Sequence, residues 1–185
     1  QKSKIQTWAS KMVSMKAISK ILFGGFLLVL IGYLLLPTPS FPLQPPDAVQ
    51  SLEDADTEIP LRRAYFTNFT REEVLAHYQR QFEWSSLGIL LPTYRLNYPP
   101  EDAQALIRDQ TRSTFLEEIV HPFRESFFVN GFKPSLAKDD IWYKGRHFEQ
   151  KITVKYVPSS IFVRLPLAIF SFIALPALRE SPPDS

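Results

Sequence analysis

Two pairs of acidic and imidazole side chains have a spacing that could support chemistry. Glu118 and His121 form an E-x-x-H sequence, which on a helix places a carboxylate and an imidazole on one face, as in di-iron carboxylate bundles. Such a centre needs two copies from four helices, and the sequence holds only one. Glu73 and His77 form a second pair with a different spacing. We therefore expect ordinary polar pairing at both places and assign no metal ligand.

Nucleophilic catalysis needs a serine, a base and a third group that orients the base. Acidic residues and serines occur near the histidines at 77, 121 and 147, but no more than the composition of the chain leads one to expect, and their spacing matches no catalytic set. The sequence has no G-x-S-x-G or H-E-x-x-H motif and no glycine loop that could cradle phosphate. It has no cysteine, which excludes disulfides, thiolate metal sites and cysteine nucleophiles. We assign no catalytic residue and no cofactor, and keep a hydrolase that uses Glu118 and His121 as an alternative.

Charged residues around the E-x-x-H pair form the candidate interaction surface. It comprises Arg112, Glu117, Glu118, His121 and Arg124. A run of charges of this kind is more often a solvated face than a recognition surface. These residues are therefore a place to look for a partner, without an assigned chemistry.

Positive charge is concentrated before the first apolar run. Residues 1–20 contain no acidic residue and five lysines, namely Lys2, Lys4, Lys11, Lys16 and Lys20. Residues 41–160 carry 14 Lys and Arg against 17 Asp and Glu, a net charge of −3. A nucleic-acid-binding domain would instead carry its basic residues on the folded body. The charge pattern argues against nucleic acid as a partner.

The segment from Ile21 to Leu36 is an unbroken apolar run. Its 16 residues span about 24 Å as a helix, and Ala17 and Ile18 extend it toward the ~30 Å hydrocarbon core of a bilayer. A cleaved signal peptide is the rival interpretation. The proline-rich exit lacks a small-x-small cleavage site, so we expect an uncleaved transmembrane helix. The basic flank 1–20 then lies in the cytoplasm and the main domain outside the plasma (inner) membrane.

A second apolar run covers Ile161 to Leu178 and precedes a polar tail at 179–185. It is long enough to cross a bilayer, although Arg164, Pro166 and Pro176 interrupt it. We expect a second transmembrane helix that returns the C terminus to the cytoplasm. A helix packed on the domain or lying in the membrane interface remains the alternative.

Residues 37–60 are rich in proline and acids and predict an extended linker before a domain at 61–158. In the domain, a helix is expected from Arg71 to Phe82. Thr70 is its N-cap and Glu73 the reciprocal capping-box residue. The other expected elements are strands at 62–66, 90–96 and 126–130, a helix from 103 to about 111, and a hairpin of 141–143 with 148–157 around Lys144-Gly145. The stretch 114–132 is ambiguous, because LEEIVHPF can form either a helix or a strand that breaks at Pro122.

Helices early and antiparallel strands late predict an α+β fold. We expect a small antiparallel sheet of four or five strands with about two packed helices, flanked by the two apolar helices.

Three stretches carry a resemblance to a known family. They are LRRAYFTNFTREEVLAHYQRQF, TYRLNYPPEDAQALIRDQTRSTFLEEIVHPFRESFFVNGF and GRHFEQKITVKYVP. Together they resemble an uncharacterised family of short membrane-anchored proteins from small-genome bacteria, over about Leu61 to Leu178. The resemblance implies a bacterial cell-envelope protein with an anchor and one domain, and it implies no activity.

The sequence thus favours a non-enzymatic, membrane-tethered extracytoplasmic domain that binds or scaffolds another envelope component. The lipid bilayer is its expected partner, together with a membrane or envelope protein. An accessory subunit of a membrane complex, with the apolar helices as its interface, is the alternative.

Overall fold

The structure is a computed structural model that describes residues 2–85, 93–107 and 113–179, with side chains described at 18–83, 93–107 and 113–170. The chain divides into two compact units. One consists of residues 37–160, and the other of residues 1–36 together with 161–185. Each unit is described by itself.

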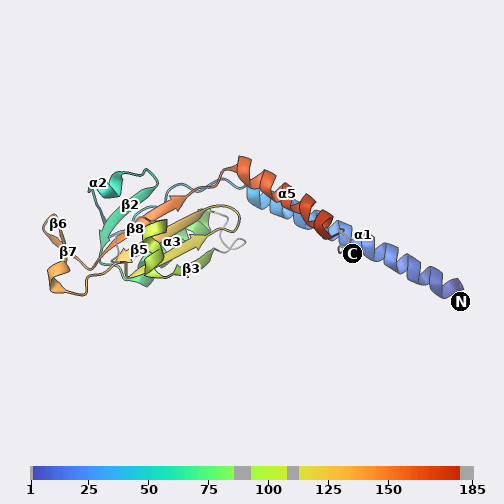
Figure 1. Cartoon of the computed structure of the whole chain (residues 1–185), viewed down its shortest axis with the longest axis horizontal. Helices are drawn as coiled ribbons and strands as arrows, with labels where there is room; N and C mark the ends of the chain where they lie inside the picture. Colours follow the sequence, from blue (N-terminus) through green and yellow to red (C-terminus); the bar gives the residue numbers. More distant parts are fainter. Residues whose placement is uncertain (1, 86–92, 108–112, 180–185) are drawn as a thin grey trace, which may run out of the picture. The chain divides into compact units, whose positions relative to one another are not determined.

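The second unit contains two apolar helices (Figure 1). Helix α1 covers Lys2–Leu35, and helix α5 covers Ile161–Arg179 and contacts α1. The window Ile18–Leu35 has a mean hydropathy of 2.2 and is only 6% buried. By length and composition, it can cross a membrane. The described side chains of α5 reach only Phe170, and that apolar stretch is too short to cross on its own.

The domain is built on a six-stranded sheet in the order β1-β2-β8-β5-β4-β3, in which every neighbouring pair is antiparallel. The strands are β1 Val49–Gln50, β2 Arg62–Thr67, β3 Tyr94–Tyr98, β4 Phe115–Val120, β5 Ser126–Phe132 and β8 Gln150–Val157. The expected α+β class and antiparallel sheet are confirmed. The sheet is larger than the four or five strands predicted.

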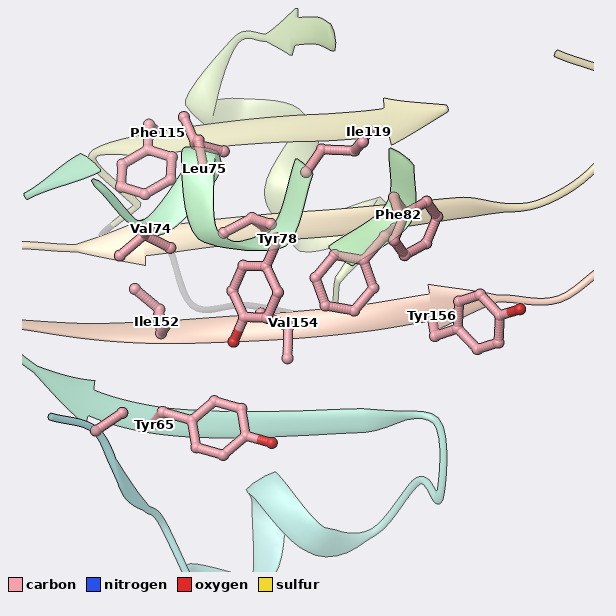
Figure 2. Close-up of a cluster of buried hydrophobic side chains, with 13 residues drawn as sticks. Tyr65, Val74, Leu75, Tyr78, Phe82, Phe115, Ile119, Ile152, Val154 and Tyr156 are labelled. Atoms are coloured by element: carbon pink, nitrogen blue, oxygen red, sulfur yellow. The ribbon is translucent and has the colours of Figure 1, made fainter. Parts of the chain in front are cut away.

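Helix α3, Arg71–Ser85, covers one face of this sheet. Its residues Val74, Leu75, Tyr78 and Phe82 pack on apolar side chains from the four strands β2, β4, β5 and β8, among them Tyr65, Ile119, Ile152 and Val154 (Figure 2). The predicted capping box is present. The Thr70 N–H donates to Glu73 Oε2 over 2.8 Å, and the Glu73 N–H donates to Thr70 Oγ1 over 3.3 Å. The helix therefore begins where its sequence signal places it.

Shorter helical elements accompany the sheet. Helix α2 covers Asp54–Thr57, and the 3-10 turn η2 at Pro100–Asp102 leads into α4, Ala103–Leu106. Ala103 and Ile107 pack on Leu116 and Phe128, which form a second, smaller core on the opposite face from α3. The helix expected at 103–111 is present as far as Leu106, and residues 108–112 lie outside the described part.

The ambiguous stretch at 114–132 forms the β4–β5 hairpin. Phe115 and Ile119 face the α3 core, whereas Leu116 faces the second core. In a strand, successive side chains point to opposite faces, so this segment contributes apolar side chains to both cores. A helix, with 3.6 residues per turn, would not give this alternation. The helical interpretation of LEEIVHPF is therefore wrong.

The last predicted hairpin forms in part. Its turn has positive φ at Lys144 (50°) and Gly145 (75°) and joins β6, Ile141–Tyr143, to β7, Arg146–Phe148. These two strands form a separate small sheet, with the 3-10 turn η3 at Ala137–Asp139 before it. Strand β8 pairs with β2 and β5 instead. The side chains of β8 at 152, 154 and 156 are buried. A position between β2 and β5 in the large sheet covers these side chains, whereas a two-stranded ribbon would leave them exposed to water.

The proline-rich segment 37–60, predicted as an extended linker, lies within the domain unit. The Tyr156 hydroxyl donates to the Pro39 carbonyl over 2.9 Å. The side-chain amide of Gln81 on α3 accepts from the Leu43 N–H over 2.8 Å and donates to its carbonyl over 3.1 Å. The segment is not extended throughout, because it contains β1 and the short helix α2, and partners remote in the sequence hold it against the domain.

Gly131 gives a test of the strand register. It lies opposite Phe115, and a Cβ at this position would overlap the Phe115 ring. We expect Gly131→Ala to lower the free energy of unfolding of the domain by about 2 kcal/mol, because overpacking a core displaces its side chains. Thermal unfolding followed by near-ultraviolet circular dichroism measures the change.

Gly32→Ala is the matched control, since nothing lies within 4 Å of a Cβ added there. A Gly131→Ala protein as stable as the Gly32→Ala protein would contradict the register.

Candidate functional site

The two ends of the sheet have different surroundings: the chain connects to the apolar helices at one end and not at the other. At one end, Val157 pairs with Ser126, and the Arg124 guanidinium donates from Nη2 to the Pro37 carbonyl over 2.9 Å. Both covalent connections to the apolar helices leave from this end, which we call the tether end. The opposite end, which we call the free end, holds Thr67 and Gln150. Eight-residue β8 separates the two ends by about 23 Å.

The free end carries a cavity of about 710 Å³. Four chain segments that are distant in sequence meet there, and the lining residues are Asn68, Phe69, Thr70, Arg71, Thr114, Phe115, Lys133, Pro134, Ser135, Glu149 and Gln150. The volume is within the range of cavities that bind small molecules or a few residues of a peptide. We take this cavity as the candidate binding site.

Side chains of the lining bond the separate segments together. Asn68 Oδ1 accepts from the Glu149 N–H over 3.0 Å, and the buried Gln150 amide donates to the Phe69 carbonyl. At the rim, Lys133 Nζ lies 3.0 Å from Glu149 Oε2. This bond lowers the pKa of Glu149 and so favours the ionised form of its carboxyl. Hydrogen bonds and an ion pair therefore connect separate segments of the cavity wall in the absence of a ligand.

Arg71 is held at the cavity by a buried carboxylate. Its guanidinium donates from Nε to Glu117 Oε1 over 2.7 Å, while Arg95 donates from Nη2 to Glu117 Oε2 over 2.8 Å. Asn97 Oδ1 accepts from Arg71 Nη2 over 3.1 Å. The Glu117 side chain is 3% exposed, whereas those of Arg71 and Arg95 are 40% and 33% exposed. One buried anion thus fixes two cations between α3, β3 and β4.

The chemistry of the lining is mixed. Phe69, Phe115 and Pro134 supply apolar surface, while Arg71, Lys133 and Glu149 supply charge of both signs. The N-terminus of α3 is capped by the Glu73 carboxylate, which accepts a hydrogen bond from the Thr70 N–H. This bond lowers the pKa of Glu73. A helix N-terminus capped by a carboxylate does not attract a second anion. The cavity suits a ligand with apolar and polar groups better than a simple anion.

A buried polar cluster lies in the β4–β5 turn at the tether end. His121 Nδ1 is 2.8 Å from Glu125 Oε1, and Arg124 Nη2 is 3.0 Å from the same oxygen. All three side chains are 0% exposed. The imidazole stacks on Phe82 with ring centroids 5.2 Å apart. His121 Nε2 is buried and has no hydrogen-bond partner in the part of the chain that the structure describes.

The E-x-x-H pair does not form a site. Glu118 and His121 lie on a strand and in the turn after it, not on a helix. Glu118 Oε2 accepts from the Tyr98 hydroxyl over 2.6 Å, and His121 pairs with Glu125. Across residues 18–83, 93–107 and 113–170, no three His, Asp or Glu side chains gather as a metal would require.

The other acid–imidazole pair is also taken up locally. His77 Nε2 lies 2.9 Å from the Leu43 carbonyl and 2.7 Å from Gln81 Nε2, so it helps to hold segment 37–60 on α3. Glu73 caps the same helix at its start. The two residues therefore have separate structural roles.

The described members of the predicted interaction surface do not lie together on one exposed face. Glu117, His121 and Arg124 are buried, Glu118 is half-buried, and Arg112 lies outside the described residues. Glu117 forms the ion pair with Arg71, whereas His121 and Arg124 lie in the β4–β5 turn. No local sequence pattern indicates the cavity, because its lining comes from four segments that only the strand register brings together. The helix start after Asn68 and the strand end before Pro134 were the available local signals.

Comparisons with protein-family models, with curated proteins and with solved structures found no match to this chain. A function must therefore be argued from its own geometry.

Tyr98 and Glu118 give a test of the geometry on the face opposite α3. The hydrogen bond to the Glu118 carboxylate raises the pKa of Tyr98 to about 12. Because this value exceeds that of an unfolded tyrosine, about 10, the bond contributes fully to stability below pH ~10. That contribution is lost as the pH rises from about 10 to about 12. We expect Glu118→Gln to return the Tyr98 pKa toward about 10.

A titration by nuclear magnetic resonance, with tyrosine labelled at Cζ, measures this pKa. Glu149→Gln at the free end is the control and should leave Tyr98 unchanged. A wild-type Tyr98 that titrates near 10 would contradict the bond.

Proposed function

We propose that this chain is a membrane-tethered binding domain, with no enzymatic role, whose cavity at the free end takes up a short segment of another envelope protein. The observation that carries the proposal is the separation of roles along β8. Both connections to the apolar helices leave one end of the sheet, and the cavity lies at the other end.

The helical unit supports the tether. Side chains of α1 such as Ile21, Leu28 and Val29 are each 73% exposed, which is costly in water and favourable in hydrocarbon. A buried core helix of a soluble domain would not have only 6% of its apolar window covered. In this proposal, α5 is a second span at 161–178, and exposed Phe162 and Phe170 face lipid. In this proposal, the lysines in the first part of α1, from Lys2 to Lys20, keep the start of the helix in the cytoplasm, and the domain then lies outside the plasma membrane.

The lining supports a polypeptide ligand. The rings of Phe69 and Phe115 can contact apolar side chains of a ligand. At the rim, Lys133 offers a positively charged hydrogen-bond donor and Glu149 a negatively charged acceptor. Peptide backbone and side chains need both kinds of contact. The lining residues include no histidine, and each of Arg71, Lys133 and Glu149 is engaged in an ion pair. These features favour binding over a hydrolytic role.

Topology is the first test. The chain has no cysteine, so single cysteines at Ser10, Ser135 and Ser185 can be probed on intact cells with a membrane-impermeant thiol reagent. We expect labelling at Ser135 only, and labelling at all three positions once the cells are permeabilised. An unlabelled Ser135 would place the domain in the cytoplasm and overturn the extracytoplasmic part of the proposal. Labelling at Ser185 on intact cells would remove the second span.

Peptide selection tests the cavity. Full-length protein in lipid nanodiscs would be screened with a displayed library of random peptides, and the affinities of selected peptides measured. We expect Ser135→Trp, which fills the cavity, to weaken binding about tenfold or more, since steric filling removes contacts equivalent to at least ~1.4 kcal/mol. Gln104→Trp, on the exposed side of α4, is the matched control and should bind as the wild type does. Selected peptides that bind both variants equally, or a screen that yields none, would overturn the cavity as the binding site.

A further inference from the structure

The turn that joins β4 to β5 is arranged in an unusual way. Its sequence, His-Pro-Phe-Arg-Glu at 121–125, is mostly polar. The charged and imidazole side chains of His121, Arg124 and Glu125 point inward and are 0% exposed. The phenylalanine between them, Phe123, is 82% exposed. A turn in water normally has the opposite arrangement, with its charges outside and its aromatic ring covered.

The backbone of Phe123 is also strained. Its φ of 61° lies in the left-handed region, which a bulky residue rarely adopts and which glycine or asparagine enters at little cost. The turn is held in this form by backbone bonds from the His121 N–H to the Glu125 carbonyl and from the Arg124 N–H to the His121 carbonyl, both 3.0 Å. Strain of this kind at an exposed position points to a functional constraint.

The turn is bonded to the segment of chain that follows α1. Helix α1 ends at Leu35, and Arg124 bonds to the carbonyl of Pro37, two residues later. Two residues of chain span no more than about 7 Å. The buried ion pair thus fastens the base of the turn to the chain just beyond the apolar helix. Other exposed apolar side chains lie at the same end of the sheet, at Tyr94 (56%) and Val157 (37%).

From this arrangement we propose that the 121–125 turn is a second membrane contact, in which Phe123 inserts into the interface of the same bilayer that α1 crosses. The inference rests on the proposed tether and adds to it a defined orientation, with the tether end against lipid and the free-end cavity about 23 Å of β8 away. An aromatic ring is favourable at the boundary of headgroups and acyl chains. The inward position of Arg124 and Glu125 leaves no charge of this turn to be desolvated there.

A lipid surface explains the turn better than a protein partner does. The turn is fastened within two residues of the predicted span, so the bilayer is the surface that it meets first. A partner protein would also have to reach a ring beside the anchor, where lipid headgroups compete for it. Binding of Phe123 to a protein is therefore the alternative outcome of the test.

The test uses the full chain, reconstituted in phosphatidylcholine vesicles and isolated by flotation. A nitroxide label is attached at Phe123→Cys and, as matched control, at Leu136→Cys, an exposed apolar residue that follows the cavity rim. Electron paramagnetic resonance then measures the collision of each label with oxygen, which concentrates in lipid, and with a nickel chelate, which stays in water. We expect the label at 123 to meet oxygen and to be shielded from nickel, and the label at 136 to behave in the opposite way.

A second variant removes the concern that the label itself seeks lipid. With the nitroxide at Val157→Cys, replacing Phe123 by Asp should lift the tether end and increase collisions with nickel, because a charge is excluded from the interface. Leu136→Asp in the same labelled chain should change nothing.

The possible results separate the two proposals. A chain that fails to float with the vesicles overturns the tether and this inference together. A chain that floats, but whose label at 123 is as accessible to nickel as the label at 136, overturns the second contact and leaves the tether standing. An unchanged label at 157 in the Phe123→Asp protein also overturns the second contact and points to a protein partner for Phe123.

Discussion

The register of β8 against β2 and β5 is the constraint on which the rest of this structure depends. It places Ile152 and Val154 under α3 and turns Lys151 and Lys155 to the other face, where Lys151 pairs with Asp56 over 2.8 Å and Lys155 donates to the Leu106 carbonyl over 2.9 Å. A slip by one residue would exchange the two sets and bury both lysines in the core. The same register gathers the chain connections at one end of the sheet and the cavity at the other.

Features coded by neighbouring residues could be predicted, and features coded by distant ones could not. The start of α3 depends on Thr70 and Glu73, three residues apart, so its capping box was visible in the sequence. The strand nature of 115–120 was ambiguous, because Glu117 interrupts the apolar alternation. Its carboxylate is buried only because Arg71 and Arg95 meet it from separate elements. The Glu117 carboxylate, which would be solvated in an isolated strand, is thus buried and links helix α3 to the sheet through its ion pairs.

Composition alone also gave an incomplete account of residues 37–60. Proline favours extended backbone, and an extended chain without apolar patterning is typical of a linker. An extended chain can equally lie along a domain when it finds hydrogen-bond partners, and here the side-chain amide of Gln81 pairs with both backbone groups of Leu43. Phe41 adds edge contacts with Phe127 and Tyr156. No local pattern signals these partners, since each lies at least 38 residues away from the residue it contacts.

The two ends of the sheet differ in how they treat charge, and this difference connects the fold with the proposed role. At the free end, Lys133 and Glu149 are 61% and 51% exposed, where water or a ligand can reach them. At the tether end, Arg124 and Glu125 are withdrawn from solvent completely. Burying such a pair costs several kcal/mol in desolvation per ion, which the attraction between the ions offsets only in part. In the proposed orientation on a bilayer, burial of this pair means that the domain does not present these two charges to lipid.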